Sequence, residues 1–213
     1  MTRSDLTHLY FLLDRSGSMQ SIKSDIEGGF TAFVEEQRKG AGECLASLAQ
    51  FDDVYEVVYT DKPVADVPPL DLHPRNSTAL HDAMGWLISA AGEKLAALPE
   101  AERPGTVVVA IMTDGLENAS REWHGPAIKS LVELQTKQYG WTFLYMGADQ
   151  DAVEVGAGLG IAAASSVTYS RRKARDAMAM SGGKIREYRT DKMANPAAAM
   201  PAFTDEERRS LSE

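Results

Sequence analysis

The sequence contains little of the chemistry that builds disulfides or soft-metal sites. Cys44 is the one cysteine among 213 residues, so no disulfide can form within the chain, which favours a reducing compartment. A single cysteine also excludes a zinc site of the Cys-x-x-Cys kind. The four histidines (His8, His73, His81 and His124) lack the spacing of metal ligands. Because Cys44 lies in an apolar stretch, we expect it to be a small buried side chain.

Long apolar runs and an excess of basic residues are also missing. The apolar run at residues 9–13 is too short for a signal peptide and ends at Asp14 and Arg15. No stretch approaches the roughly 20 apolar residues of a membrane span, so we expect a cytoplasmic protein without membrane contact. Acidic residues outnumber basic ones by 31 to 22, giving a formal net charge of −9, which disfavours nucleic acid as a partner.

The sequence does contain alternating strand-like and helix-like segments. Short apolar or β-branched runs predict strands at residues 6–13, 44–51, 54–59, 106–112, 141–146 and 166–169. Helical spacing of apolar residues predicts helices at 19–39, 80–98, 126–138, 151–159 and 172–189, the last interrupted at Ser181-Gly182-Gly183.

These segments predict an α/β fold that is doubly wound and Rossmann-like. Alternating strands and helices indicate a mostly parallel six-stranded sheet with helices on both faces. Only Asp52-Asp53 separates the second and third strands, so this pair must be antiparallel and gives one antiparallel edge strand. We expect one domain over residues 1–189 and a partly irregular tail over 190–213, where Thr204 and Glu207 have the spacing of a helix cap.

The most informative motif follows the first predicted strand directly. Asp14, Ser16 and Ser18 alternate at a spacing of two, so a turning or extended backbone would direct all three side chains to one point. All three carry oxygen, which is the donor that hard cations such as Mg²⁺ prefer. In an open parallel sheet, ligands bind where loops leave the carboxyl ends of the strands.

Two further loops offer oxygen ligands at the same predicted end of the sheet. Thr78 lies just before the second helix, and Asp114 directly follows the strand at residues 106–112 and Thr113. Neighbouring strands are about 4.8 Å apart, so three such loops can converge on one ion.

These three motifs, in this order, resemble the metal-ion-dependent adhesion site of von Willebrand factor A domains, among them stand-alone bacterial and phage proteins. The resemblance covers residues 6 to about 169. It implies that Ser16 and Ser18 bind a metal ion directly, and that Thr78 does so when a ligand is engaged and otherwise through water. It also implies that Asp14 and Asp114 act largely through bridging waters and by holding the serines. One departure is that Asn76 and Ser77 stand where many relatives have glycines.

The resemblance implies a non-enzymatic adaptor or assembly module that binds Mg²⁺, with Mn²⁺ or Ca²⁺ possible, and captures an Asp or Glu of a partner protein. One alternative is a metal-dependent phosphohydrolase, for which His124 and Asp149 are the candidate helpers. Another is a self-assembling subunit whose acidic tail residues (Asp205, Glu206 or Glu207) enter the site of the next copy. The oligomeric state stays open.

Structural roles compete with functional ones at each residue. Asp14 can be a turn residue, and Ser16 and Ser18 can be helix caps. Near the predicted site, we expect Asp82 to interact favourably with the helix dipole and Trp123 to pack in the core, with an exposed anchor for a partner as the alternative. Loop polarity or a place at the rim of the site is expected for Glu117, Asn118, Asp149, Gln150 and Asp151. We interpret the basic run at residues 171–192 as a solvated helix face.

Overall fold

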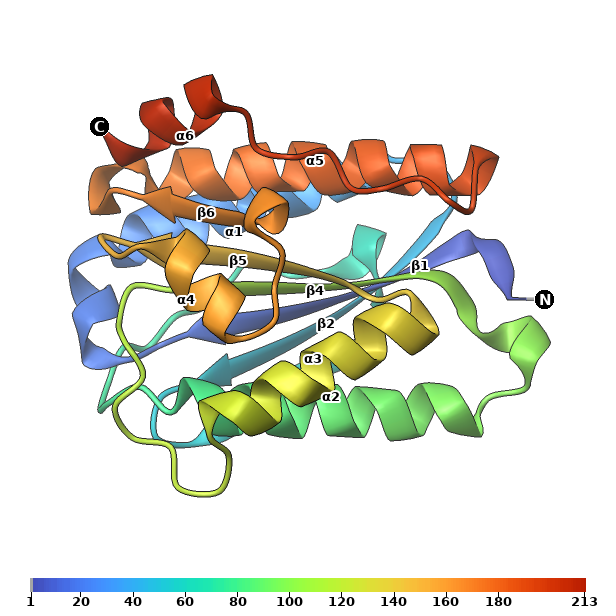
Figure 1. Ribbon diagram of the computed structural model, residues 1–213. Helices are drawn as coiled ribbons and strands as arrows, with labels where there is room; N and C mark the ends of the chain where they lie inside the picture. Colours follow the sequence, from blue (N-terminus) through green and yellow to red (C-terminus); the bar gives the residue numbers. More distant parts are fainter. Residues whose placement is uncertain (1) are drawn as a thin grey trace.

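The computed structural model describes residues 2–213 and confirms the predicted α/β class. Figure 1 shows one twisted sheet lying between two layers of helices. The strands are β1 (Arg3–Asp14), β2 (Glu43–Phe51), β3 (Tyr55–Pro63), β4 (Pro104–Thr113), β5 (Thr142–Ala148) and β6 (Ser166–Tyr169). They lie in the order β3-β2-β1-β4-β5-β6.

Five strands of this sheet are parallel, and β3 is the antiparallel edge strand that the short turn predicted. Strand β3 extends beyond its predicted end, to Pro63, because it continues to pair with β2 after two register shifts. β1 lies at the centre, paired with β2 on one side and β4 on the other.

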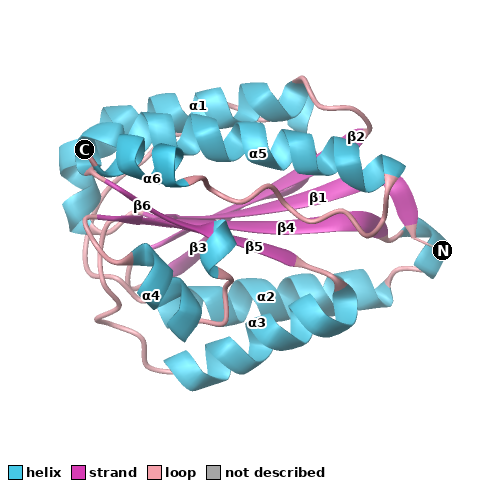
Figure 2. Ribbon diagram, turned by 45° about the horizontal axis from the view of Figure 1, so that its top comes forward, coloured by secondary structure: helices cyan, strands magenta, loops and turns pink. Residues whose placement is uncertain are grey.

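Helices cover both faces of the sheet, as Figure 2 shows. One face carries α1 (Lys23–Arg38), α5 (Ala174–Ala194) and α6 (Asp205–Ser212). The other carries α2 (Leu80–Ala97), α3 (Gly125–Tyr139) and α4 (Ala152–Gly158). Short 3-10 turns occupy Gly17–Ile22, Val64–Asp66, Glu100–Glu102, Ala163–Ser165 and Arg171–Lys173. Within residues 2–213, no helix has the length and apolar character needed to cross a membrane.

The central strand β1 is apolar at consecutive positions because helices cover both faces of the sheet. Along β1, Phe11 and Leu13 belong to the cluster under α1 and α5, whereas Tyr10 and Leu12 belong to the cluster under α2 and α3. Side chains alternate across a strand, so a strand covered on both faces must be apolar at consecutive positions. Cys44 is buried, as expected.

The predicted interruption of the last long helix is wrong, because α5 runs unbroken through Ser181, Gly182 and Gly183. A Cβ at Gly182 would lie 3.0 Å from the Cα of Phe33 on α1. The Gln37 side chain of α1 also donates a hydrogen bond to the Gly182 carbonyl, at 2.8 Å. The glycine is therefore present for close helix packing rather than to break the helix.

The C-terminal segment packs on the rest of the chain. Thr204 and Glu207 form the predicted capping box at the start of α6. Phe203 and Leu211 are buried in the same cluster as α1 and α5. Arg208 donates hydrogen bonds to the carbonyls of Ser166 and Ala163, each at 2.6 Å.

Candidate metal centre

The structure brings the predicted site residues together at the carboxyl ends of β1 and β4. These strands are neighbours and parallel, and their register pairs Leu13 with Met112. The loops that carry Asp14 and Asp114 therefore leave the sheet at the same level. Thr78 lies in the segment just before α2, whose Ala79 amide donates to the carbonyl of Asp52 at the end of β2.

Asp14 is completely buried, and both of its carboxylate oxygens accept hydrogen bonds. Oδ1 accepts from the Ser16 amide and Oδ2 from the Thr113 hydroxyl, both at 2.6 Å. Burial raises the pKa of Asp14 to about 6, and these hydrogen bonds only partly oppose the effect. A buried carboxylate of this kind gains stability from a nearby positive charge.

The two serine hydroxyls lie between the carboxylates. Ser16 Oγ is 3.1 Å from Ser18 Oγ, and Ser18 Oγ donates to Asp114 Oδ1 at 2.5 Å. Ser16 precedes the 3-10 turn but makes no side-chain cap, so the helix-capping alternative does not describe it. The hydroxyls instead form a chain that ends on a carboxylate.

The side chain of Asp114 is fully buried, yet its Oδ2 oxygen has no hydrogen-bond partner among the described residues. Burial also raises the pKa of Asp114, against the opposing hydrogen bond from Ser18 and the charge of Arg171. A buried carboxylate oxygen that accepts no hydrogen bond is costly, which makes this atom a natural ligand for a cation.

Gly115 leaves room at the centre of the group. A Cβ at this position would lie 3.1 Å from Thr78 Oγ1 and 3.9 Å from both Asp14 Oδ2 and Ser18 Oγ. The Thr78 hydroxyl, the Asp14 carboxylate and the Ser18 hydroxyl therefore surround one small space.

The residues present fit a divalent hard cation. Three hydroxyls and two carboxylates converge, and the two carboxylates match the charge of one divalent ion. Residues 2–213 contain no cluster of three or more His, Cys, Asp or Glu side chains arranged to hold a metal. The candidate centre therefore needs the hydroxyls of Ser16, Ser18 and Thr78 as ligands. These hydroxyls would hold the ion together with the carboxylates of Asp14 and Asp114.

An ion-pair network around the buried Asp52 carboxylate, which was not predicted from the sequence, holds two of the site loops. Asp52 Oδ2 lies 3.2 Å from Arg15 Nε and 2.6 Å from Arg75 Nε, and Arg15 also reaches Glu56 at 2.5 Å. Burial alone would raise the pKa of Asp52, but hydrogen bonds from Arg75 and Val54 and the two guanidinium charges lower it. The only sequence indication was that Arg15 lies inside the motif itself.

Residues after Asp114 brace the site. The Asn118 side chain accepts a hydrogen bond from the Thr78 amide, and Glu117 accepts one from the His81 amide. Asp82 accepts from the amides of Arg121, Glu122 and Trp123, so it anchors this loop to α2. Trp123 packs against the cluster under α2 and α3, which favours the packing interpretation.

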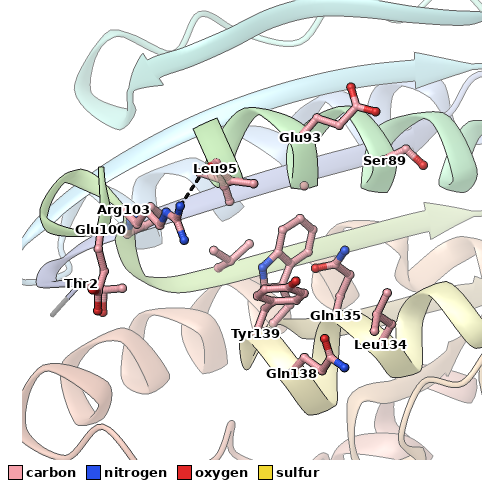
Figure 3. A pocket seen from close by; sticks show the side chains of 15 residues that line it. Thr2, Ser89, Glu93, Leu95, Glu100, Arg103, Leu134, Gln135, Gln138 and Tyr139 are labelled. Carbon is pink, nitrogen blue, oxygen red and sulfur yellow. Dashed lines mark hydrogen bonds between the residues drawn. The ribbon is translucent and has the colours of Figure 1, made fainter. Parts of the chain in front are cut away.

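One cavity lies away from these residues. It has a volume of about 630 Å³ and lies between α2, α3 and the start of β4. Figure 3 shows Leu95, Gln135 and Tyr139 among the side chains that line it, and none of the candidate ligands is among them. A smaller pocket of about 380 Å³, lined by Asp114, Gly115, Asp149 and Arg171, adjoins the candidate centre.

No protein-family model and no curated protein sequence match the chain. Solved structures, in contrast, do match the chain. A von Willebrand factor type A protein from Catenulispora acidiphila is 14% identical with a TM-score of 0.55, and the match covers 84% of this chain and 42% of that one. The ArnB paralog VWA2 from Sulfolobus acidocaldarius is 14% identical with a TM-score of 0.54, over 81% of this chain and 44% of that one. The chain has a von Willebrand factor A fold.

The same von Willebrand factor A fold also aligns with proximal thread matrix protein 1 from the mussel byssus. That match is 16% identical with a TM-score of 0.60, and covers 84% of this chain and 45% of the other. The chain thus spans less than half the length of each of these three proteins. Identities this low establish the fold and leave function to the site.

The backbone conformation of Asn76 explains how this residue can stand where many von Willebrand factor A domains have glycine. Asn76 has a φ of 59°, in the left-handed region that glycine adopts most easily. Asparagine is the side chain that tolerates this region best after glycine. Its carbonyl accepts a hydrogen bond from Gly17 at 3.1 Å, so the loop before Thr78 is tied directly to the Asp14–Ser18 motif.

Proposed function

We propose that this chain is a non-enzymatic, metal-dependent protein-binding module with an adaptor or assembly role in the cytoplasm. It would bind Mg²⁺, with Mn²⁺ or Ca²⁺ as alternatives, and capture an Asp or Glu side chain of a partner protein. The observation that supports this function is the convergence of the candidate ligands (Asp14, Ser16, Ser18, Thr78 and Asp114) around the space beside Gly115.

The arrangement of charges favours capture of an acid. Asp14 uses both oxygens to hold the Ser16 amide and the Thr113 hydroxyl, and Asp114 uses one oxygen to hold Ser18. Much of the negative charge therefore organises the loops. A bound divalent ion would keep one open coordination position, at which it stays electron-poor. A carboxylate of the partner protein would complete this position through a charge-assisted contact.

The hydrogen bonds favour binding over catalysis. Ser16 and Ser18 are hydrogen-bonded to each other, and Ser18 to Asp114. Among the hydrogen bonds of residues 2–213, neither hydroxyl is paired with a histidine or lysine that would activate it as a nucleophile. This pairing supports a role of the two serines as ligands. The phosphohydrolase alternative is tested by turnover of p-nitrophenyl phosphate with Mg²⁺ or Mn²⁺; turnover that disappears in Asp114→Ala would replace the binding proposal.

Isothermal titration of the whole chain with MgCl₂ and MnCl₂ tests the metal centre. We expect one bound ion per chain, and no binding by Asp14→Ala when circular dichroism shows that the variant is folded. Asp53→Ala is the control, because it removes an exposed carboxylate whose one side-chain hydrogen bond among the described residues is with the Asn76 side chain. Unchanged affinity in Asp14→Ala would overturn the assignment of the site.

Partner capture needs a separate measurement. The immobilised chain is incubated with cell extract in Mg²⁺ and eluted with a chelator, alongside immobilised Asp14→Ala. A protein that elutes only from the wild-type column, and that loses binding when one of its own carboxylates is replaced, would support the proposal. Equal retention by both columns would contradict it.

A further inference from the structure

Arg171 contacts Asp114 of the candidate centre at Oδ2, the carboxylate oxygen that Ser18 does not bind. It lies in the 3-10 turn between β6 and α5, which the sequence analysis had assigned to a solvated helix face. Its Nη2 atom is 3.4 Å from Asp114 Oδ2 and also 3.4 Å from the Asp114 carbonyl oxygen, to which it donates a hydrogen bond. Among the described residues, this is the one basic side chain that forms an ion pair with a candidate ligand.

The contacts of Arg171 are loose compared with those of the other arginine near the site. Its Nε atom is 3.8 Å from Asp149 Oδ2 and is buried without a hydrogen-bond partner in the described part of the chain. The side chain is 42% exposed, whereas that of Arg15 is 6% exposed and is only 2.5 Å from Glu56. Arg171 is therefore positioned by charge between two carboxylates rather than fixed by close hydrogen bonds.

We propose that the Arg171 guanidinium is an internal cation that competes with the metal ion for Asp114 and so sets the metal affinity of the site. This inference rests on the metal-binding function proposed above. Without a metal ion, Arg171 partly neutralises the buried carboxylate. When an ion binds, the guanidinium shifts its pairing towards Asp149, which lines the same 380 Å³ pocket.

Elementary electrostatics supports the competition. Asp114 Oδ2 has no hydrogen-bond partner within residues 2–213, so Arg171 and a metal ion would both be attracted to the same oxygen. Two positive charges a few ångströms apart repel each other strongly where the surroundings are partly desolvated. Occupancy by one therefore lowers the affinity for the other, and such couplings are typically 5- to 150-fold.

The first test compares Arg171→Ala with Arg172→Ala by isothermal titration with MgCl₂ and MnCl₂. We expect Arg171→Ala to bind the ion on the order of 10-fold more tightly than wild type. Arg172 is exposed and forms no ion pair among the described residues, so its variant removes the same charge one position away and should change affinity less than about 3-fold. Circular dichroism checks that both variants are folded.

The possible outcomes separate the Arg171 competition from the metal-binding function. Tighter binding by Arg171→Ala than by both wild type and Arg172→Ala supports the competition, including the case where wild type binds no ion at millimolar concentration. Equal or weaker binding by Arg171→Ala overturns the competition and leaves the metal-binding function intact. Absence of binding by wild type and by Arg171→Ala overturns both.

A second, independent test uses the other carboxylate of the pair. Asp149→Asn keeps a side chain that tolerates the left-handed backbone of this residue, whose φ is 48°. Without Asp149, Arg171 pairs only with Asp114, so metal affinity should fall further than in the control Glu154→Gln, which removes an exposed carboxylate from the same pocket. The excess loss should disappear when Arg171→Ala is also present. An equal loss in both backgrounds would contradict the role of Arg171.

Discussion

The guanidinium of Arg15 is buried against the carboxylate of Asp52, with Nε 3.2 Å from Oδ2. This pair links two loops of the candidate site, because Arg15 lies inside the Asp14–Ser18 motif and Asp52 follows β2. Asp52 also binds Arg75, whose amide donates to the Arg15 carbonyl. A carboxylate outside the ligand set thus fixes the position of residues within it.

Replacing Asp52 by alanine should destabilise the fold. The change leaves the Arg15 charge buried with only the more exposed Glu56 as a partner, and removes the acceptor for the Val54 amide. We expect a loss of about 3 kcal/mol in the free energy of unfolding, measured with urea. Asp53→Ala is the adjacent control and should cost less than about 1 kcal/mol. A comparable loss in both variants would show that the buried pair is not the cause.

The two adjacent glycines of α5 should respond in opposite directions to alanine. A Cβ at Gly182 would be 3.0 Å from the Phe33 Cα and 3.2 Å from its carbonyl oxygen, whereas a Cβ at Gly183 would meet no described atom within 4 Å outside the adjoining helix backbone. Overpacking against a backbone costs roughly 1–3 kcal/mol, so Gly182→Ala should destabilise. Gly183→Ala should stabilise by roughly 0.5–1 kcal/mol through helix propensity. Thermal or urea unfolding compares them, and effects of the same sign would contradict the packing argument.

Filling the space beside Gly115 should weaken metal binding with little effect on folding. The new Cβ of Gly115→Ala would press on the Thr78 hydroxyl at 3.1 Å. Displaced residues around a metal typically reduce its affinity 10- to 100-fold, so we expect a loss of about 10-fold in the Mg²⁺ titration. Gly158→Ala is the control, because a Cβ there would meet no described atom within 4 Å outside the adjoining helix backbone. Unaltered affinity in Gly115→Ala would show that Thr78 takes no part in the site.

His8 should make stability depend on pH between 7 and 5. Burial lowers the pKa of His8 to about 4, and the Lys94 charge adds to this while Asp61 partly opposes it. The unfolded chain has a histidine pKa near 6.5, so it takes up a proton first as the pH falls. The stabilisation is therefore complete above about pH 6.5 and is lost towards pH 4, with roughly 2 kcal/mol lost by pH 5. Urea unfolding at several pH values measures the slope, which should flatten in His8→Gln; an unchanged slope would exclude His8 as its source.

The helix and strand pattern followed from the sequence because it depends on local periodicity. The β1 and β4 segments are apolar at consecutive positions since both of their faces are covered, and the short Asp52-Asp53 turn allowed only an antiparallel pair. The placement of Asp14 and Asp114 followed from the same logic, because residues at the carboxyl ends of parallel strands meet at one edge of the sheet. Thr78 precedes a helix instead, and the metal-binding roles of all five residues came from the resemblance.

Three features could not be predicted, since each depends on which distant segments come into contact. The break expected at Gly182 is absent because α1 packs there, and nothing near Gly182 in the sequence indicates Phe33. The buried pairing of Arg15 with Asp52 joins residues 37 positions apart. Arg171 was grouped with a basic helix face, but the order of β4, β5 and β6 brings it to Asp114, 57 residues away.

The sequence by itself therefore determined the elements, the sheet class and the oxygen-rich loops, because periodicity and short turns act over a few residues. Only the tertiary structure decided which hydrogen bonds hold each candidate ligand residue and which charged side chain lies next to it. Burial and the pairing of distant side chains set the pKa of a carboxylate and the environment of Asp114, and both arise only when the layers are assembled.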